Sequence, residues 1–241
     1  MLNLTMPLTS SNPILSVVLP CLNEEQSLAV CLREIKQTAD KMHIPYEIIV
    51  ADNRSTDGSA QVARSFGARV VPVARRGYGA AVNGGILAAR GEVVLFGDAD
   101  CSYPFYDIPK LVTPILQGKQ DFVLGNRLNN TQEKGSMPWM NRYFGTPVLS
   151  ALIRWFYGIA VYDCNGGMRA FLRKIYAPLG LKQPGMEYAS EMLIAAAKQN
   201  LRYLEVPIAL RRAHPSHTPY LRPWRDGMRH LYIILKSLFA R

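Results

Sequence analysis

The sequence predicts a single α/β domain whose mostly parallel sheet is flanked by helices. Short apolar runs such as Val93-Val94-Leu95-Phe96 lack polar alternation, as expected of strands covered on both faces. These runs alternate with stretches of helical periodicity over the first half of the chain, which favours parallel strands joined by right-handed crossovers. The 241 residues suffice for one such domain with a substantial core, and no repeat, low-complexity tract or linker divides them.

The apolar patterns define the elements in order along the chain. Buried strands are expected over 14–19, 46–51, 69–73, 92–97, 122–125 and 201–208, and a short strand follows the Gly166-Gly167 turn. Helices are expected over 59–66, 80–89, 108–117, 141–157 and 187–199. An earlier helix, capped by Asn23 or Ser27, places Leu28, Cys31, Leu32 and Ile35 on one face. Gly145 and Pro147 are expected to interrupt the helix over 141–157.

Two segments differ from this regular pattern. Residues 1–13 are polar and contain proline, and we expect a loose N-terminal tail. Residues 126–139 lack apolar periodicity, which indicates a mobile loop of the kind that covers active sites. The expected organisation is therefore a tail over 1–13, the domain over 14–210 and a basic amphipathic segment over 211–241.

The positive charge of the chain is concentrated near its C-terminus. The formal net charge is +10, and residues 206–241 contain seven Lys or Arg and a single acidic residue. Such a segment suits an anionic membrane, nucleic acid or a phosphorylated ligand. Five apolar residues of this segment lie at near-helical spacing: Trp224, Met228, Leu231, Tyr232 and Leu235. The resulting amphipathic helix either lies at a membrane interface or packs on the protein's own core.

Several classes of protein are disfavoured. The four cysteines are widely spaced, without a Cys-x-x-Cys pair, so a zinc site or disulfide framework is not expected and a reducing compartment fits. The N-terminus lacks the basic and apolar regions of a signal peptide. No run reaches the roughly 20 apolar residues of a membrane span. We expect a cytoplasmic protein that can lie peripherally at a membrane face.

Two carboxylates, Asp98 and Asp100, directly follow the apolar run over 93–97. In open α/β sheets, ligands bind beyond the carboxyl ends of the strands, and alternate residues of an extended chain point to the same side. Paired carboxylates suit Mg²⁺ or Mn²⁺, which commonly also bind substrate phosphates. A polar strand end or an Asx turn is the alternative.

Polar or glycine-rich residues also follow the other early strands. They are Asn23 and Glu24, Asp52 and Asp57, and Arg76 and Gly77. In a parallel sheet these strand ends meet at one edge, which would then offer carboxylates to a base, a ribose and a metal, and open backbone to a phosphate. A dinucleotide fingerprint is disfavoured because Val82 stands where its third glycine belongs, and because the motif does not follow the first strand.

Basic and imidazole side chains supply further candidates. Arg127, Lys134 and Arg142 lie in or just after the expected loop, where they can bind phosphate or simply face solvent. His214 and His217 have no acidic partners nearby in the sequence. We expect these two histidines to be surface or loop residues and not a catalytic base or zinc ligands.

The ordered set of motifs resembles a known family. The run Val18–Glu25, the turn Asp52–Gly58 and Asp98-Ala99-Asp100 are similar to family 2 glycosyltransferases of the GT-A fold. Farther along, the resemblance is to the polyprenyl-phosphate branch of that family and rests on Gly125–Arg127, Asp163–Phe171, Met186–Met192 and Leu221–Leu231. Together the motifs cover residues 14–235.

The resemblance implies a GT-A domain that transfers a hexose, with inversion, from a UDP- or GDP-linked sugar to a polyprenyl phosphate. It implies that Pro20, Asn23, Glu24 and Asp52 surround the base and ribose, that Asp98 and Asp100 hold Mg²⁺ or Mn²⁺ on the diphosphate, and that Arg127, with Arg142, binds phosphate of the donor or the acceptor. Nucleic acid is not an expected partner.

The chain departs from the family pattern at two site positions and at its end. Asn53 stands where a second Asp is common, and Ser102 stands where relatives often carry a metal-contacting Gln. Many relatives also continue into membrane spans beyond the position of Arg241.

Two alternatives to a polyprenyl phosphate acceptor remain. A soluble hydroxyl acceptor would need a general base, and Asp163, Glu187 and Glu191 are the candidates. A phosphate acceptor needs no strong base, because a phosphomonoester with a second pKa of about 6 is already anionic. The other alternative is a nucleotide-sugar-binding protein without catalytic activity.

Overall fold

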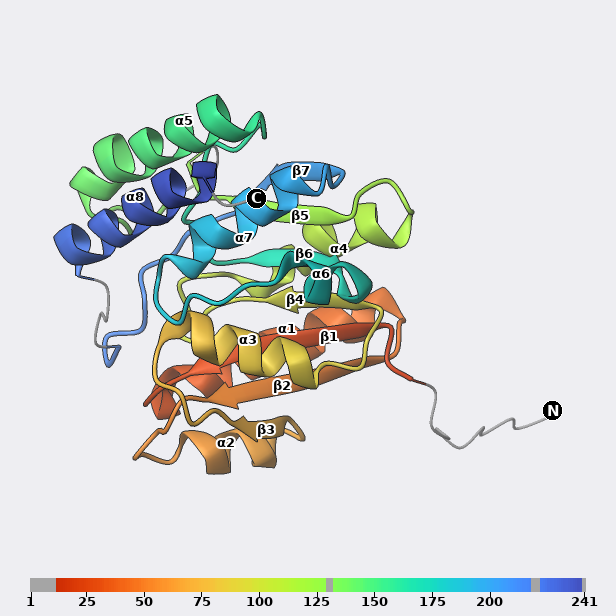
Figure 1. Ribbon diagram of the computed structural model, residues 1–241. Coiled ribbons are helices and arrows are strands. Elements are labelled where there is room, and N and C mark those ends of the chain that lie inside the picture. Colours follow the sequence, from red (N-terminus) through yellow and green to blue (C-terminus); the bar gives the residue numbers. More distant parts are fainter. Residues whose placement is uncertain (1–11, 129–131, 218–221, 240–241) are drawn as a thin grey trace.

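A seven-stranded sheet runs through the middle of the computed structural model, which describes residues 12–128, 132–217 and 222–239 (Figure 1). The strands are β1 (Leu15–Cys21), β2 (Tyr46–Asp52), β3 (Arg69–Pro72), β4 (Val93–Phe96), β5 (Phe122–Asn126), β6 (Arg169–Leu172) and β7 (Tyr203–Pro207). They lie in the order β3-β2-β1-β4-β6-β5-β7, and β6 alone runs antiparallel to its neighbours. The mostly parallel sheet of one α/β domain is confirmed.

Helices cover both faces of this sheet. One face carries α1 (Glu25–Met42), α2 (Ser59–Ser65) and α4 (Ile108–Leu116), and the other carries α3 (Tyr78–Ala88), α5 (Thr146–Tyr157), α6 (Tyr176–Leu179), α7 (Tyr188–Lys198) and α8 (Pro223–Phe239). In β1, Leu15 and Val17 pack with the first set and Val18 packs with the second. Because both faces of β1 are buried, its residues are apolar on both sides, as the sequence pattern predicts.

The register of the sheet brings the functional ends of the strands to one edge. Cys21 at the end of β1 pairs with Asp52 at the end of β2, and Val18 pairs with Phe96 at the end of β4. Since β6 is antiparallel, Phe96 pairs with Arg169, the first residue of β6. The chain therefore enters β6 at the edge where it leaves β1, β2 and β4.

The segment after β5 is more ordered than its sequence suggests, in the part that the structure describes. Gln132 forms a parallel bridge to Leu210, and the N–H of Glu133 donates to the Leu210 carbonyl at 3.0 Å. Residues 129–131 lie outside the described part. The local pattern of apolar residues cannot predict pairing with a segment nearly 80 residues away. The expected helix break is confirmed, because a π-helical turn over Asn141–Gly145 precedes α5.

Helix α8 packs beside α5 and α7, as Figure 1 shows for α5 at the upper left. Ile233 and Ile234 are buried in the core, whereas Trp224, Met228 and Tyr232 remain exposed. One face of this amphipathic helix packs on the protein's own core, which was one of the two expectations. The other face is exposed, so it remains open to a membrane interface, which was the second expectation. Among the described helices, none is long and apolar enough to span a membrane. Most of the expected N-terminal tail, residues 1–11, lies outside the described residues.

A buried histidine in α8 predicts a pH-dependent stability. His230 is hydrogen-bonded to Ser190, and burial, with help from Arg169 and against Asp226, lowers the pKa of His230 to about 4 from 6.5. Between these values the unfolded chain binds a proton that the folded chain does not, so stability falls as the pH falls. From pH 7.5 to 5.0 we expect His230 to contribute a loss of about 2 kcal/mol in the free energy of unfolding.

Urea denaturation of the parent and of His230→Asn at both pH values measures this contribution. The parent should lose about 2 kcal/mol more than the variant between the two pH values. Equal losses would contradict a neutral His230 in the folded protein.

Candidate active site

The acidic pair lies just beyond β4, as predicted. Asp98 is partly buried, and its Oδ1 accepts a hydrogen bond of 2.9 Å from the hydroxyl of Tyr78. Asp100 accepts two bonds at Oδ1, from the backbone N–H (2.9 Å) and the hydroxyl (2.6 Å) of Ser102. Burial and the neighbouring Asp100 together raise the pKa of Asp98 to about 7. A cation at this edge would relieve the repulsion.

His217 joins the acidic pair, which corrects the expectation of a histidine without acidic partners. Its Nδ1 donates to Glu24 Oε1 at 2.6 Å, and its Nε2 lies 3.8 Å from Asp100 Oδ2. The bond to Glu24 raises the pKa of His217. The backbone holds this segment in place, because the N–H of His214 donates to the Asp100 carbonyl at 2.7 Å. Glu24 and His217 are 193 residues apart, so no local pattern could reveal their contact.

The ends of β1 and β2 are joined by side chains that were predicted to bind the donor. Asn23 Oδ1 accepts the N–H of Thr56 at 2.7 Å, and Asp52 Oδ1 accepts that of Ser55 at 3.0 Å. Asp57 accepts bonds from the N–H groups of Ser59 (3.0 Å) and Glu25 (3.1 Å).

The remaining donor-binding candidates lie in β1 and in the turns that follow β1 and β3. Pro20 pairs with Ala51 inside the sheet. Glu24 uses its second oxygen to accept the hydroxyl of Ser27 at 2.7 Å. Both of its carboxylate oxygens therefore accept hydrogen bonds within the protein, and its direct role is to support His217 and not to bind the nucleobase of a donor. Arg76 is exposed, and Gly77 adjoins it immediately before α3.

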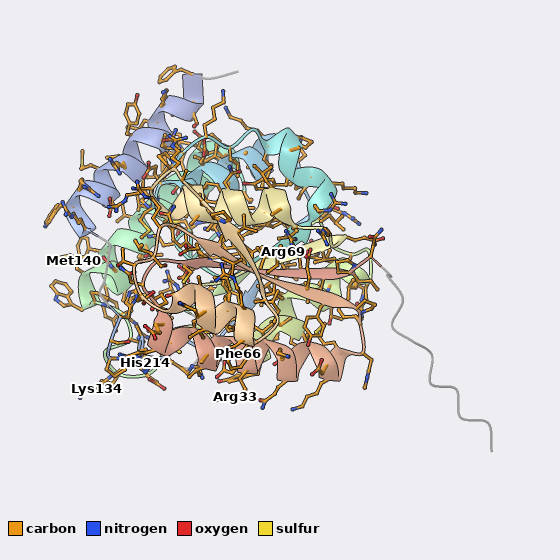
Figure 2. The ribbon with its side chains drawn as sticks, turned by 90° about the horizontal axis from the view of Figure 1, so that it is seen from below. Arg33, Phe66, Arg69, Lys134, Met140 and His214 are labelled. Carbon is orange, nitrogen blue, oxygen red and sulfur yellow. The ribbon has the colours of Figure 1, made fainter. Side chains whose placement is uncertain are left out.

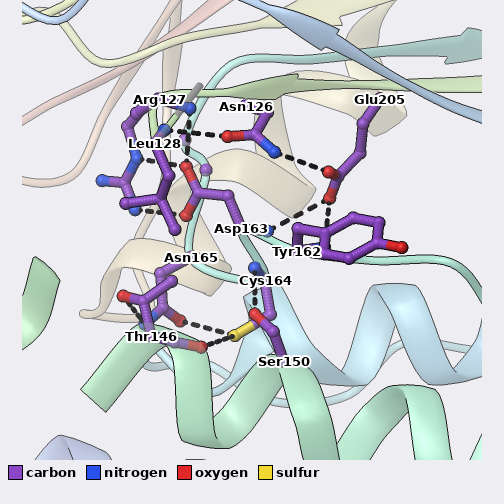
Figure 3. A network of polar contacts seen from close by, with 12 residues as sticks. Asn126, Arg127, Leu128, Thr146, Ser150, Tyr162, Asp163, Cys164, Asn165 and Glu205 are labelled. Atoms are coloured by element: carbon purple, nitrogen blue, oxygen red, sulfur yellow. Dashed lines mark hydrogen bonds and ion pairs between the residues drawn. The ribbon is translucent and has the colours of Figure 1, made fainter. Parts of the chain in front are cut away.

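Arg127 forms a buried ion pair that the sequence did not reveal (Figure 3). Its Nε and Nη2 donate to the two oxygens of Asp163 at 2.7 Å, and its backbone N–H donates to the same carboxylate. Burial opposes the charge of Arg127, but Asp163 outweighs this effect and raises the pKa of Arg127. Glu205 closes the network by accepting the N–H of Asp163 and the amide of Asn126. Asp163 is thus committed to Arg127 and poorly suited to act as a base.

Lys134 and Arg142 lie on the segment between β5 and α5. Lys134 is exposed, and in Figure 2 it lies towards the same side of the molecule as His214. Arg142 donates to Gln132 Oε1 and lies over the ring of Tyr143, with 5.5 Å from Cζ to the ring centroid.

The other two base candidates differ in how far they are already occupied. Glu191 accepts the backbone N–H groups of Lys182 and Gln183. Glu187 is 5% exposed, and within the described part of the chain its Oε2 is a buried oxygen without a hydrogen-bond partner. Arg229 lies 3.9 Å from that oxygen.

The donor set at the acidic pair fits a divalent cation. No three His, Cys, Asp or Glu side chains among residues 12–128, 132–217 and 222–239 already surround one point. However, Mg²⁺ is usually bound by one or two carboxylates together with substrate phosphates, so a complete protein cage is not required. The bond from His217 to Glu24 directs its second ring nitrogen towards Asp100, as in metal sites where a carboxylate orients a ligating histidine.

Comparisons with known proteins identify the family of the chain. The family model described as Glycosyl transferase family 2 matches residues 16–180. The chain is 38% identical over 224 residues to the low-salt glycan biosynthesis hexosyltransferase Agl6 of Haloferax volcanii, covering 92% of this chain and 53% of that protein. The chain thus spans about half the length of this relative. A dolichyl-phosphate hexose transferase of the same organism is 33% identical over 197 residues, or 82% of each chain.

A solved structure also matches most of the chain. Glucosyl-3-phosphoglycerate synthase from Mycobacterium tuberculosis, in complex with Mn²⁺, UDP and phosphoglyceric acid, has a TM-score of 0.73 and 26% identity. The match covers 95% of this chain and 80% of that one. The expected GT-A fold is confirmed by this similarity.

The Arg127–Asp163 pair predicts a large effect on stability. Asp163→Ala would leave a buried guanidinium without its partner, which should cost about 3–5 kcal/mol in the free energy of unfolding. Asp121→Ala is the matched control, because Asp121 pairs with an Arg202 side chain that is 54% exposed. The control should cost about 1 kcal/mol or less. Urea denaturation compares the two, and similar losses would refute the special weight given to Asp163.

Proposed function

Because the chain belongs to glycosyl transferase family 2, we propose that it transfers a hexose from a nucleotide-diphosphate sugar to a polyprenyl phosphate with the help of Mg²⁺ or Mn²⁺. The observation that carries the proposal is the meeting of Asp98, Asp100 and His217 at the edge where β1, β2 and β4 end. The H. volcanii relative named as a dolichyl-phosphate hexose transferase supports the acceptor.

The donor would lie along the ends of β1, β2 and β3. We assign the base and ribose to Pro20, Asn23 and Asp52, with Asp57 holding their loop through its two backbone bonds. The exposed Arg76 and the backbone at Gly77 would face the diphosphate side. The UDP bound to the M. tuberculosis synthase supports a uridine donor.

Asp98, Asp100 and His217 would hold the divalent cation. When bound, the cation acts as a Lewis acid that neutralises charge on the leaving diphosphate. Glu24 keeps the imidazole of His217 oriented by accepting its Nδ1–H. Ser102 similarly fixes Asp100, through its N–H and hydroxyl, and thus supports a metal ligand where relatives often have a metal-contacting Gln.

The acceptor phosphate would approach from the α5 side, where Lys134 and Arg142 lie. One of its oxygens forms the bond to the anomeric carbon while the bond from that carbon to the donor diphosphate breaks, which inverts the configuration. The phosphate is already ionised, so no strong base is needed, in agreement with the commitment of Asp163 to Arg127. Arg127 would contribute more weakly than Arg142, because Asp163 shares its charge.

The faces of α5 and α8 support approach to a membrane. We define the aromatic face as the exposed large apolar residues of α5, of α8 and of the segment just before α5: Trp139, Met140, Tyr143, Phe144, Val148, Trp155, Phe156, Trp224, Met228, Tyr232, Leu235, Leu238 and Phe239. Trp155 is 86% exposed and Trp224 is 82% exposed. Arg225, Arg229 and Lys236 lie between the apolar residues of α8. Aromatic residues interleaved with basic ones suit the surface of an anionic bilayer.

A soluble hydroxyl acceptor is the second candidate. The buried and incompletely bonded Glu187 favours it, because such a carboxylate could serve as the general base that a hydroxyl requires. Glu187→Gln distinguishes the two acceptors. It should abolish transfer to a hydroxyl but leave transfer to a polyprenyl phosphate largely intact.

The metal role predicts the effect of neutralising either acid. Asp98→Asn and Asp100→Asn should each reduce transfer by about 100-fold or more, since a metal supplies several kcal/mol of transition-state stabilisation. The activity is measured as product mass. The assays contain Mn²⁺, a UDP- or GDP-linked sugar, and either polyprenyl phosphate or a water-soluble acceptor. Asp121→Asn, at the start of β5, should retain parent activity. Acid-pair variants within a few-fold of the parent would refute the proposal.

The aromatic face predicts a membrane interaction that two substitutions disrupt. The double variant Trp155→Asp and Trp224→Asp should bind vesicles containing anionic phosphatidylglycerol about tenfold more weakly, in a sedimentation assay at low salt. Leu87→Asp is the matched control, because Leu87 is 67% exposed on α3 and outside the aromatic face. Binding that both variants weaken equally, or that neither weakens, would argue against docking through this face.

A further inference from the structure

Asp98 has a hydrogen bond on one carboxylate oxygen and a closely packed glycine beside the other. The Tyr78 hydroxyl donates to Oδ1 at 2.9 Å. On the other side Gly167 lies so close that a Cβ at that position would fall 2.6 Å from Oδ2. The hydrogen bond selects one orientation of the carboxylate, and the glycine leaves room for Oδ2.

Tyr78 is itself placed by the turn that precedes it. It is the first residue of α3, and Gly77 before it has φ = 129°, a conformation that side chains disfavour. A Cβ on Gly77 would lie 2.2 Å from the carbonyl oxygen of Pro184. The turn is therefore pressed against the loop before α7, and a shift in the turn would move Tyr78.

Asn53 organises this turn from the end of β2. Its Nδ2 donates to the carbonyls of Val73 (3.1 Å) and Arg75 (2.7 Å), and its Oδ1 accepts the N–H of Gly77 at 2.8 Å. Asn53 is buried, at 4% exposure. An aspartate could accept the Gly77 bond, but it has no N–H for the two carbonyls and would repel them. The amide at this position therefore matches a turn that needs two donors and one acceptor.

We propose that Tyr78 is the positioning residue for Asp98, and that Asn53 acts on Asp98 through the 73–77 turn and Tyr78. The inference rests on the proposed metal role of Asp98 and extends it to two residues that need not touch metal or donor. The same turn would lie beside the donor, so donor contacts at the ends of β2 and β3 would be coupled to the orientation of a metal ligand.

Mn²⁺ affinity measures this coupling directly. Electron paramagnetic resonance of free Mn²⁺, titrated into protein with saturating UDP, gives the dissociation constant without turnover. Tyr78→Phe should weaken Mn²⁺ binding by about 10- to 100-fold, the usual effect of removing a group that orients a metal ligand. Asn53→Asp should weaken it by a similar factor, and the double variant should lose much less than the product of the two factors, because both act along one path.

Tyr46→Phe is the matched control. The hydroxyl of Tyr46 donates to Asp40 at 2.8 Å, the same kind of bond, on the surface at the other end of β2. It should leave Mn²⁺ affinity unchanged. In steady-state assays, Tyr78→Phe should raise the Mn²⁺ concentration needed for half-maximal rate while largely recovering kcat at high Mn²⁺, which a general structural defect would not do.

Asp98→Asn separates failure of this inference from failure of the proposed function. If it leaves Mn²⁺ affinity unchanged, the metal role of Asp98 is wrong. If it abolishes binding while Tyr78→Phe stays within twofold of the parent, the positioning role alone is overturned. Multiplying losses in the double variant would overturn the shared path. Should Asn53→Asp fail to fold, Asn53→Ser, which retains a single donor, replaces it with the same expectations.

Discussion

Much of the local structure at the acidic edge follows from the burial of Asp98 beside Asp100. A carboxylate partly removed from water next to a second carboxylate is disfavoured as an anion, and the raised pKa of Asp98 reflects this. Nearby groups offset the cost in part: Tyr78 donates a hydrogen bond, and Arg127 contributes positive charge. We propose that a divalent cation completes this compensation.

The buried sheet offsets the energetic cost of this concentration of charge. Strands β1, β2 and β4 are apolar and buried, and their core on both faces stabilises the domain by roughly 1.5–3 kcal/mol for each fully buried large side chain. The polar groups are confined to the edge where these strands end. The turn that leads into antiparallel β6 adds the backbone of Gly167 next to Asp98. The stabilising apolar residues and the destabilising acidic ones are thus adjacent in sequence but separated in space.

The second half of the chain supplies what the first half lacks. The segment after β7 brings His217 to Glu24 and Asp100, and the loop before β6 brings Asp163 to Arg127. Helices α5 and α8 then present the aromatic face beside the basic residues of α8. The proposed water-soluble donor and lipid-linked acceptor would meet on one domain, which carries both the acidic edge and the aromatic face.

Apolar periodicity and the residues that follow each run were enough to predict the mostly parallel sheet, the acidic pair after β4 and the polar ends of β1 and β2. These features are local, because strand burial and strand ends are written in neighbouring residues. Three sets of contacts could not be predicted in this way: the bond between His217 and Glu24, the ion pair of Arg127 with Asp163, and the three hydrogen bonds of Asn53. Each joins residues that only the packing of distant segments brings within hydrogen-bond distance, and neither spacing nor composition specifies which polar side chains will meet.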